Sequence, residues 1–249
     1  MDPARIASLL APFLAPDSLT DQQLAQVSTY LDLLLKWNAR INLTSVRQLE
    51  EIITRHFGES FFTARHLFPG CHPERSLPEV RRTEALSAAE GVGPRNGPSA
   101  VEGSLPRPAA ASLIDLGSGA GFPGLPIKLY APGLSVTLIE SNHKKATFLR
   151  EVIRTLTLTQ VDVFAKRAED FPRTAGIVTL RAVEQPERAL AAAARLVSPG
   201  GSLALLLGSA SASSLPGLLS GFSWGRPLAL PASTARVLML GSASTDEPR

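Results

Sequence analysis

A hydrophobic strand that runs directly into a glycine cluster constrains the fold of this 249-residue chain more than any other feature. The segment occupies residues 113–124 and reads LIDLGSGAGFPG. In doubly wound α/β folds, ligands bind at the carboxyl ends of the strands, where glycines let the backbone approach the ligand closely. The segment therefore predicts a ligand site at the end of a parallel strand.

The rest of the C-terminal half alternates two hydrophobic patterns. Strand-like runs occupy residues 112–116, 136–139, 161–164, 177–180, 202–207 and 236–240, and helical patterns occupy 125–130, 144–156 and 186–196. Alternating strands and helices with short connections are typical of a doubly wound, mainly parallel sheet. We therefore expect an α/β domain over residues 113–249.

The N-terminal residues 1–68 follow a helical pattern instead. Asp2-Pro3 reads as an N-cap followed by proline in the first turn, and Thr20 with Gln23 reads as a capping box. An apolar stripe then leads to Trp37, which we expect to pack in the core. Residues 69–112 are rich in Pro, Arg and Glu and show no period. They predict a flexible insert between a small helical domain and the α/β domain.

Composition excludes several classes of protein. The formal net charge is +3 and the pI is near 9.3, a mild basic excess that is compatible with a polyanionic partner. The single cysteine, Cys71, excludes a disulfide framework and a cysteine-built metal site. No apolar run approaches the length of a membrane span. We expect a cytoplasmic, monomeric protein that binds neither membrane nor metal.

The glycine motif alone leaves two ligands open, because Gly119 to Gly124 also fits the dinucleotide fingerprint G-x-G-x-x-G. Asp115 lies two residues before Gly117, where a carboxylate suits the amino group of an amino-acid-like ligand better than a pyrophosphate. Glu140 follows Gly117 by 23 residues and is placed to accept hydrogen bonds from ribose hydroxyls, which fits NAD equally well. Asp115 and the nearby prolines favour S-adenosylmethionine.

Two alternatives from other classes are an NAD(P)-dependent oxidoreductase and a catalytically idle RNA-binding protein on a methyltransferase scaffold. The oxidoreductase predicts a Tyr–Lys or His–Asp pair in the second half of the chain. Tyr130 is the only tyrosine there, the last histidine is His143, and neither has an evident partner. The intact glycine motif and Glu140 argue against the idle scaffold.

Several further motifs, in order along the chain, resemble those of the RsmG (GidB) family of bacterial methyltransferases. They are LKWN at 35–38 with NLTS at 42–45, RHFGES at 55–60, LIDLGSGAGFPG at 113–124, KKATFLR at 144–150, RAEDF at 167–171 and Arg181 with Ala182. The resemblance implies a sheet of the class I S-adenosylmethionine-dependent methyltransferase type and transfer of a methyl group to a guanosine N7 of 16S rRNA. It implies 16S rRNA or the small ribosomal subunit as partner.

The resemblance also implies roles for individual residues. The expected cofactor contacts are Asp115, Gly117, Gly119, Phe122, Glu140, Ala168, Glu169 and Arg181. Gly117 and Phe122 would line the methionine end, Glu140 would hold the ribose, and Ala168 with Glu169 would flank the adenine. Arg181 could also contact the target base. The alternatives are that Phe122 caps the core, that Glu169 pairs with Arg167, and that Arg181 is a solvated charge.

On the N-terminal side, Lys36, Arg40, Arg47 and Arg55 are candidates for a face that contacts RNA phosphates. We expect His56 to be a hydrogen-bonded histidine between the domains rather than a base. No catalytic residue is expected beyond groups that position the substrate, because guanine N7 carries no proton. One departure from the family is Leu207 before Gly208, where its members usually have lysine.

Overall fold

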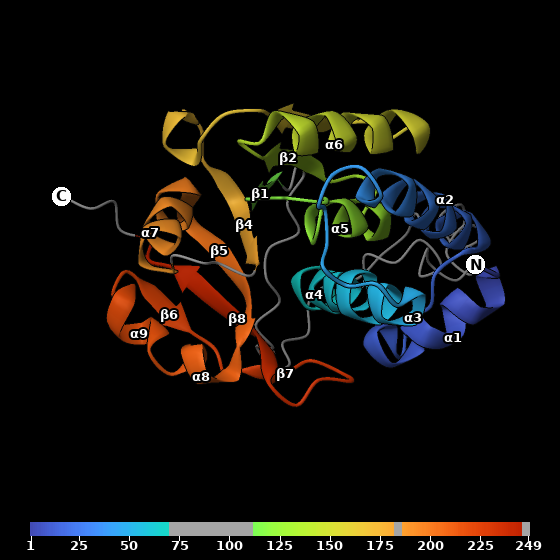
Figure 1. The fold of residues 1–249 in the computed structure, drawn as a ribbon. Helices are drawn as coiled ribbons and strands as arrows, with labels where there is room; N and C mark the ends of the chain where they lie inside the picture. The colour runs from blue at the N-terminus through green and yellow to red at the C-terminus, as the bar shows by residue number, and fades with distance from the viewer. Residues whose placement is uncertain (70–111, 182–185, 246–249) are drawn as a thin grey trace, which may run out of the picture.

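A computed structural model describes residues 1–69, 112–181 and 186–245 (Figure 1). The insert predicted at 69–112, which includes Cys71, lies outside the described residues apart from its two end positions. The strands are β1 Ser112–Leu116, β2 Ser135–Ile139, β3 Val161–Phe164, β4 Ala175–Arg181, β5 Val197–Gly208, β6 Phe222–Trp224, β7 Leu228–Ala229 and β8 Arg236–Ala243. The helices that precede the sheet are α1 Pro3–Leu14, α2 Asp21–Asn38, α3 Leu49–Ile52, the π-helix η1 Ile53–Gly58 and α4 Glu59–Leu67. Those within the sheet region are α5 Gly124–Tyr130, α6 His143–Thr155, the 3-10 turn η4 Ala168–Asp170, α7 Pro186–Leu196, α8 Ser209–Ala212 and α9 Leu215–Leu218.

The sheet has the order β3-β2-β1-β4-β5-β8-β6, and β7 pairs with β8 beside this path. The first five strands are parallel, and β8 runs antiparallel to β5, β6 and β7. The strand order reverses at β1, which lies between β2 and β4, so the glycine segment after β1 leaves the sheet at its switch point. This arrangement confirms the doubly wound, mainly parallel sheet of the class I methyltransferase type.

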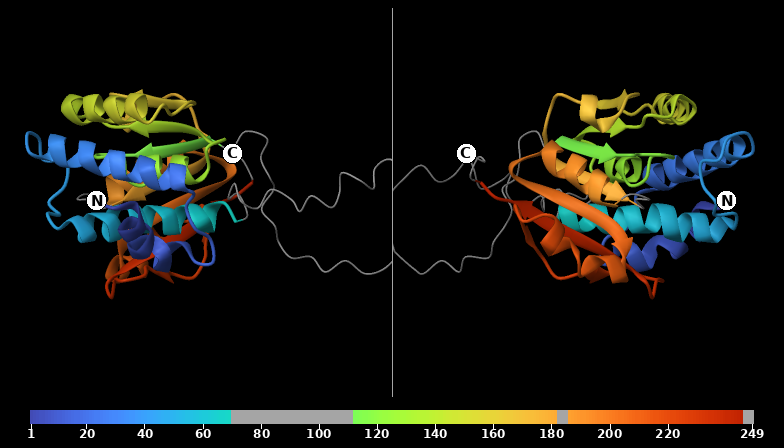
Figure 2. Two further views of the ribbon diagram at one scale, coloured as in Figure 1. Left: turned by 90° about the vertical axis from the view of Figure 1, so that its right-hand side faces the viewer. Right: turned by 60° about the vertical axis from the view of Figure 1, so that its left-hand side comes forward.

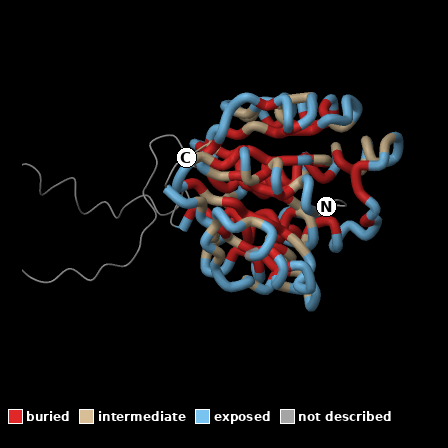
Figure 3. The backbone as a smooth tube through the Cα atoms, turned by 90° about the vertical axis from the view of Figure 1, so that its left-hand side faces the viewer, coloured by how far each residue is buried: buried red, intermediate tan, exposed pale blue. Residues whose placement is uncertain are grey.

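Side chains that alternate along the strands build a core on each face of the sheet. Leu113 and Leu138 face one cluster together with α5 and α6, whereas Ile114 and Val178 face the other cluster together with α7. Buried positions run through the sheet and along the inner sides of the helices, as Figure 3 shows. The glycine segment is therefore fixed between two packed layers.

The N-terminal helices lie on the same face as α5 and α6 (Figure 2). The capping box of Thr20 and Gln23 that begins α2 is confirmed, and the Gln23 side-chain amide also donates to the carbonyl of Leu129 at 2.8 Å. Phe13 and Tyr30 belong to the same apolar cluster as Phe148 of α6. Residues 1–68 thus share one core with a face of the sheet. The domain boundaries at 68 and 113 stay predictions.

Three glycines of the segment after β1 adopt left-handed backbone conformations. The φ angles are +68° at Gly117, +57° at Gly119 and +88° at Gly121. A Cβ on Gly121 would lie 2.3 Å from the Tyr30 hydroxyl and 2.6 Å from a methyl carbon of Leu125. Gly121 is therefore required both by its backbone conformation and by the close approach of α2 and α5.

We expect Gly121→Ala to lower the free energy of unfolding by at least about 2 kcal/mol, since a left-handed alanine costs roughly 1–2 kcal/mol before any clash. Gly133→Ala is the matched control, because Gly133 is exposed and a Cβ there meets no atom within 4 Å. Urea denaturation of the two variants measures the difference. Equal stabilities would show that the turn after β1 accommodates a side chain at Gly121.

Candidate functional site

A cavity of about 470 Å³ lies at the carboxyl ends of β1, β4 and β5, where the N-terminal helices meet the sheet. The sequence brings three groups of residues to it. The turn after β1 contributes Gly117, Ser118, Gly119, Ala120 and Phe122, the N-terminal part contributes Thr44, Arg55, His56 and Glu59, and the strands contribute Arg181, Leu207 and Arg236. Four of the predicted site residues, Gly117, Gly119, Phe122 and Arg181, therefore lie in its wall, together with the RNA candidate Arg55.

Asp115 supports the turn from beneath. Its carboxylate accepts a hydrogen bond from the amide of Gly124 at 3.2 Å and another from the Thr179 hydroxyl at 2.8 Å. The side chain is 1% exposed, and burial raises its pKa to about 6. Asp115 does not line the cavity. A direct contact with a cofactor amino group stays a prediction, whereas the bond to Gly124 fixes the start of α5.

Glu140 connects the end of β2 to the same turn. One carboxylate oxygen accepts from the amide of Gly119 at 2.9 Å, and the other accepts from the amide of Asn142 at 2.7 Å. A Cβ added to Gly117 would meet no atom within 4 Å, and one added to Gly119 would meet only the Gly117 carbonyl at 3.8 Å. The backbone of the turn is thus free of contacts on the side where a side chain would lie, and a carboxylate lies beside it. This arrangement fits a ligand that carries a ribose.

Ala168 and Glu169 lie in η4, after β3, and neither lines the cavity. Ala168 is buried, whereas the exposed Glu169 accepts two hydrogen bonds from Arg188 at 2.8 and 3.1 Å. Glu169 thus forms a surface ion pair, as the alternative predicted, but its partner is Arg188 rather than Arg167. The adenine contact of this loop stays a prediction.

Three aromatic rings stack beside the turn. Phe122 lies between Tyr30 and His56, with ring centroids 5.4 Å and 5.0 Å apart and interplanar angles of 3° and 21°. The hydroxyl of Tyr30 donates to the carbonyl of Ala120. Phe122 is 6% exposed and also contributes to the cavity wall. It therefore caps the core and faces the cavity at once, so the two readings of this residue are compatible.

His56 is held in the neutral state. Burial lowers its pKa to about 3, and the positive charges of Arg181, Arg55 and Arg236 act in the same direction. The Nε2 atom lies 2.7 Å from the Thr44 hydroxyl, but the buried Nδ1 atom has no hydrogen-bond partner among the described residues. The expectation of a hydrogen-bonded histidine is therefore confirmed for Nε2 and wrong for Nδ1. A pKa this low makes His56 a weak base.

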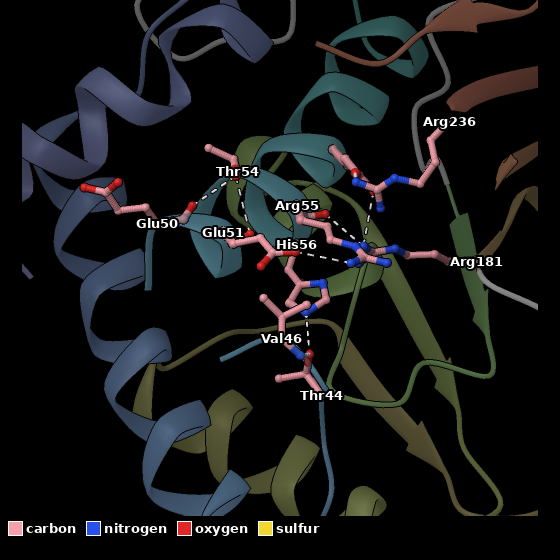
Figure 4. Close-up of polar contacts among 10 residues, drawn as sticks. Thr44, Val46, Glu50, Glu51, Thr54, Arg55, His56, Arg181 and Arg236 are labelled. Carbon is pink, nitrogen blue, oxygen red and sulfur yellow. Dashed lines mark hydrogen bonds and ion pairs between the residues drawn. The ribbon is translucent and has the colours of Figure 1, made fainter. Parts of the chain in front are cut away.

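A buried carboxylate joins the N-terminal helices to two strands at the cavity. Glu59 is 2% exposed and pairs with Arg181 at 3.1 Å and with Arg236. Arg181 also donates to the backbone carbonyl of Arg55 at 2.8 Å. Figure 4 shows the side chains of Arg181 and Arg236 converging on η1, which carries Arg55. Arg181 is thus no solvated strand-end charge, and burial lowers its pKa to about 10.

Sequence reasoning missed the contribution of Glu59 and Arg236. Glu59 is the acidic member of the RHFGES motif, which marked it without giving it a partner. Arg236 begins β8, and only the antiparallel pairing of β8 with β5 brings it opposite Gly208 at this edge of the sheet. A strand direction that the hydrophobic pattern does not reveal thus decides which arginine reaches the cavity.

The remaining RNA candidates lie away from the cavity. Lys36, Arg40 and Arg47 are exposed and do not line it, whereas Arg55 does and pairs with Glu51 at 3.3 Å. Trp37 packs against Phe148 with ring centroids 5.8 Å apart, which confirms its packing role. The phosphate-contacting face stays a prediction.

Within residues 1–69, 112–181 and 186–245, no helix is both long and apolar enough to span a bilayer. The same residues contain no group of three or more His, Cys, Asp or Glu side chains placed to hold a metal ion.

Several solved structures resemble part of this chain. An O-methyltransferase family protein from Burkholderia thailandensis aligns with a TM-score of 0.47 and 19% identity, over 55% of this chain and 52% of that chain. P. horikoshii TYW2, solved in complex with MeSAdo, aligns with a TM-score of 0.46 and 17% identity, over 53% of this chain and 57% of that chain.

Sequence comparison gives a more specific result. The GidB family model, described as rRNA small subunit methyltransferase G, matches residues 23–70 and 100–217. Ribosomal RNA small subunit methyltransferase G of Chloroflexus aggregans is 36% identical over 191 residues, which are 74% of this chain and 64% of that protein. Its counterpart in Xanthomonas campestris pv. campestris strain B100 is 31% identical over 233 residues, which are 92% of this chain and 91% of that protein. With the motifs and the sheet in agreement, the chain belongs to the rRNA small subunit methyltransferase G (GidB) family.

Proposed function

We propose that this protein transfers a methyl group from S-adenosylmethionine to N7 of a guanosine in 16S ribosomal RNA, and that it acts as a monomer in the cytoplasm. The observation that carries the proposal is the Glu140 carboxylate bonded to the Gly119 amide, beside open backbone at the switch point of the sheet. The names of the family and of its relatives supply the reaction class and the RNA.

The cofactor would lie across the turn after β1. Glu140 would accept from the ribose hydroxyls, since each of its oxygens has a second lone pair beside the one that an amide already uses. Gly117 and Gly119 would let the backbone approach the cofactor, and Phe122 would form the wall at its methionine end. Arg181 offers a cation at the same end. Asp115 would hold the turn in place through its hydrogen bond to the Gly124 amide.

The adenine contacts belong to the same proposal. Ala168 and Glu169 follow β3, whose carboxyl end lies beside that of β2 in the sheet. Because Glu140 ends β2, an adenine attached to its ribose would extend toward this loop. Arg195 donates to the Ala168 carbonyl at 2.5 Å, which ties the loop to α7.

When bound, S-adenosylmethionine supplies a methyl group that is already activated for transfer. Guanine N7 has an in-plane lone pair and no proton, so the protein needs no general base. Its task is alignment of acceptor and donor, and orientation of this kind can contribute roughly 7–11 kcal/mol. The ionisable groups nearby agree with this task, because His56 has a pKa of about 3 and Asp115 lies beneath the turn.

The oxidoreductase alternative has less support at the cavity. Its lining, as far as the structure describes the chain, includes neither tyrosine nor lysine. The hydroxyl of Tyr130 instead hydrogen-bonds to Asp17 at 2.9 Å, at the end of α5 that points away from the glycine turn. A hydride-transfer enzyme would need a proton donor where this protein has arginines.

We expect Glu140→Ala to weaken S-adenosylmethionine binding by about 10- to 100-fold, because hydrogen bonds to a charged group contribute roughly 1.5–3 kcal/mol. Asp162→Ala is the matched control, since Asp162 is an exposed acid on the neighbouring strand β3. Calorimetric titration gives both dissociation constants, and a thermal melt checks folding. Unchanged affinity in a folded Glu140→Ala variant would move the ribose contact elsewhere.

The rate of methyl transfer should be nearly flat between about pH 7 and 9, because no proton leaves the acceptor and no base must ionise. This window lies above the Asp115 pKa of about 6 and below the Arg181 pKa of about 10, so both groups keep one charge state across it. Single-turnover methylation of the ribosomal substrate at constant ionic strength reports the step. A steep rise with one apparent pKa inside the window would exclude N7 as the acceptor.

A further inference from the structure

A second hollow of about 350 Å³ lies next to the first cavity. The two share Arg55, Glu59 and Arg236 in their walls. The second hollow runs between η1 and the loop 231–235 that leads into β8. A chain that enters the first cavity can therefore continue over Arg236 along the surface of this loop.

Positive charge is in excess at the junction. The guanidinium groups of Arg55, Arg181 and Arg236 face two carboxylates, Glu51 and Glu59, which leaves a net charge of +1 over both hollows. Of these two acids only Glu59 is buried, and the exposed Glu51 forms an ion pair with Arg55. Burial lowers the pKa of Arg236, the negative charge of Glu59 opposes this shift, and the positive charge of Arg55 adds to it. The junction therefore keeps a net positive charge although Glu59 attracts both strand arginines.

Glu59 holds the two strand arginines in place by its ion pairs, while His56 adds no charge because it stays neutral. The side chain of Arg236 keeps 27% of its surface exposed, against 12% for Arg181. Arg236 therefore retains donors that can reach a ligand at the junction. A guanidinium suits a phosphate better than other anions, because its fork of N–H donors matches two phosphate oxygens.

We propose, on the basis of the proposed function, that Arg236 and Arg55 form a binding site for a backbone phosphate of the RNA strand next to the target nucleotide. The walls of the second hollow favour a sugar-phosphate chain over a stacked base. Their described residues include the hydroxyl-bearing Thr54, Ser233 and Thr234 and a single aromatic residue, Phe13, which is only 1% exposed. The strand thus passes from the cofactor cavity over Arg236 to the loop 231–235.

The test measures binding of a 16S rRNA fragment, without cofactor, as a function of salt. Each lost phosphate contact lowers the slope of log K against log salt by roughly 0.7 to 1. We expect this loss for Arg236→Gln and for Arg55→Gln, with KM for the RNA raised about 5- to 10-fold, kcat little changed and S-adenosylmethionine affinity within twofold of the original protein. Arg236→Lys should keep the slope, because it keeps the charge.

Arg226→Gln is the matched control, since Arg226 is an exposed arginine in the turn after β6 and lines neither hollow. The proposal is overturned if Arg236→Gln and Arg55→Gln show the slope of this control, or if Arg236→Gln weakens cofactor binding as much as RNA binding. Arg55 is exposed, so its variant decides the matter if Arg236→Gln does not fold. If the protein fails to methylate rRNA but the variants change the salt slopes as expected, the proposed reaction is wrong and the phosphate site is still supported.

Discussion

The hydroxyl of Tyr30 reaches from α2 through the core to the carbonyl of Ala120, and the shape of the site depends on this contact. Tyr30 is fully buried, and its ring stacks on Phe122. A buried hydroxyl that loses its hydrogen-bond partner costs about 1–3 kcal/mol of folding free energy. Separation of α2 from the glycine turn would therefore destabilise the fold. Gly121 completes the fit, because a side chain there would occupy the space of the Tyr30 hydroxyl. The N-terminal helices thus help to fix the conformation of the turn after β1.

A second connection between the helices and the sheet is electrostatic. Glu59 at the start of α4 lies between Arg181 at the end of β4 and Arg236 at the start of β8. Breaking a buried pair of this kind typically costs about 3–5 kcal/mol, because it leaves a charge without compensation. The same ion pairs hold the guanidinium groups of Arg181 and Arg236 in the wall of the cavity. The arginines that join the layers therefore also supply the positive charge of the cavity.

Hydrophobic period predicted the central strands β1–β5 and β8 and the helices α5–α7, because each has an apolar pattern long enough to recognise, whereas the glycine cluster predicted the turn after β1. The short elements β6, β7, α8 and α9 were missed, since two to four residues show no period. The turn glycines and Arg181 were found as cavity residues, whereas Arg236 depended on the antiparallel direction of β8. His56 was expected to be hydrogen-bonded, but its Nδ1 atom is buried without a partner among the described residues, which sequence spacing does not reveal.

The most direct test of the proposed reaction locates the methyl group itself. The protein is incubated with S-adenosylmethionine and small ribosomal subunits whose 16S rRNA is unmodified, and nuclease fragments are then mapped by mass. Borohydride reduction followed by aniline cleaves RNA at N7-methylguanosine and so reports the methylated atom. We expect one added methyl group at a single guanosine, with chain cleavage at that position. A methyl group on another atom, or no methylation by a protein that binds the cofactor, would contradict the proposed reaction.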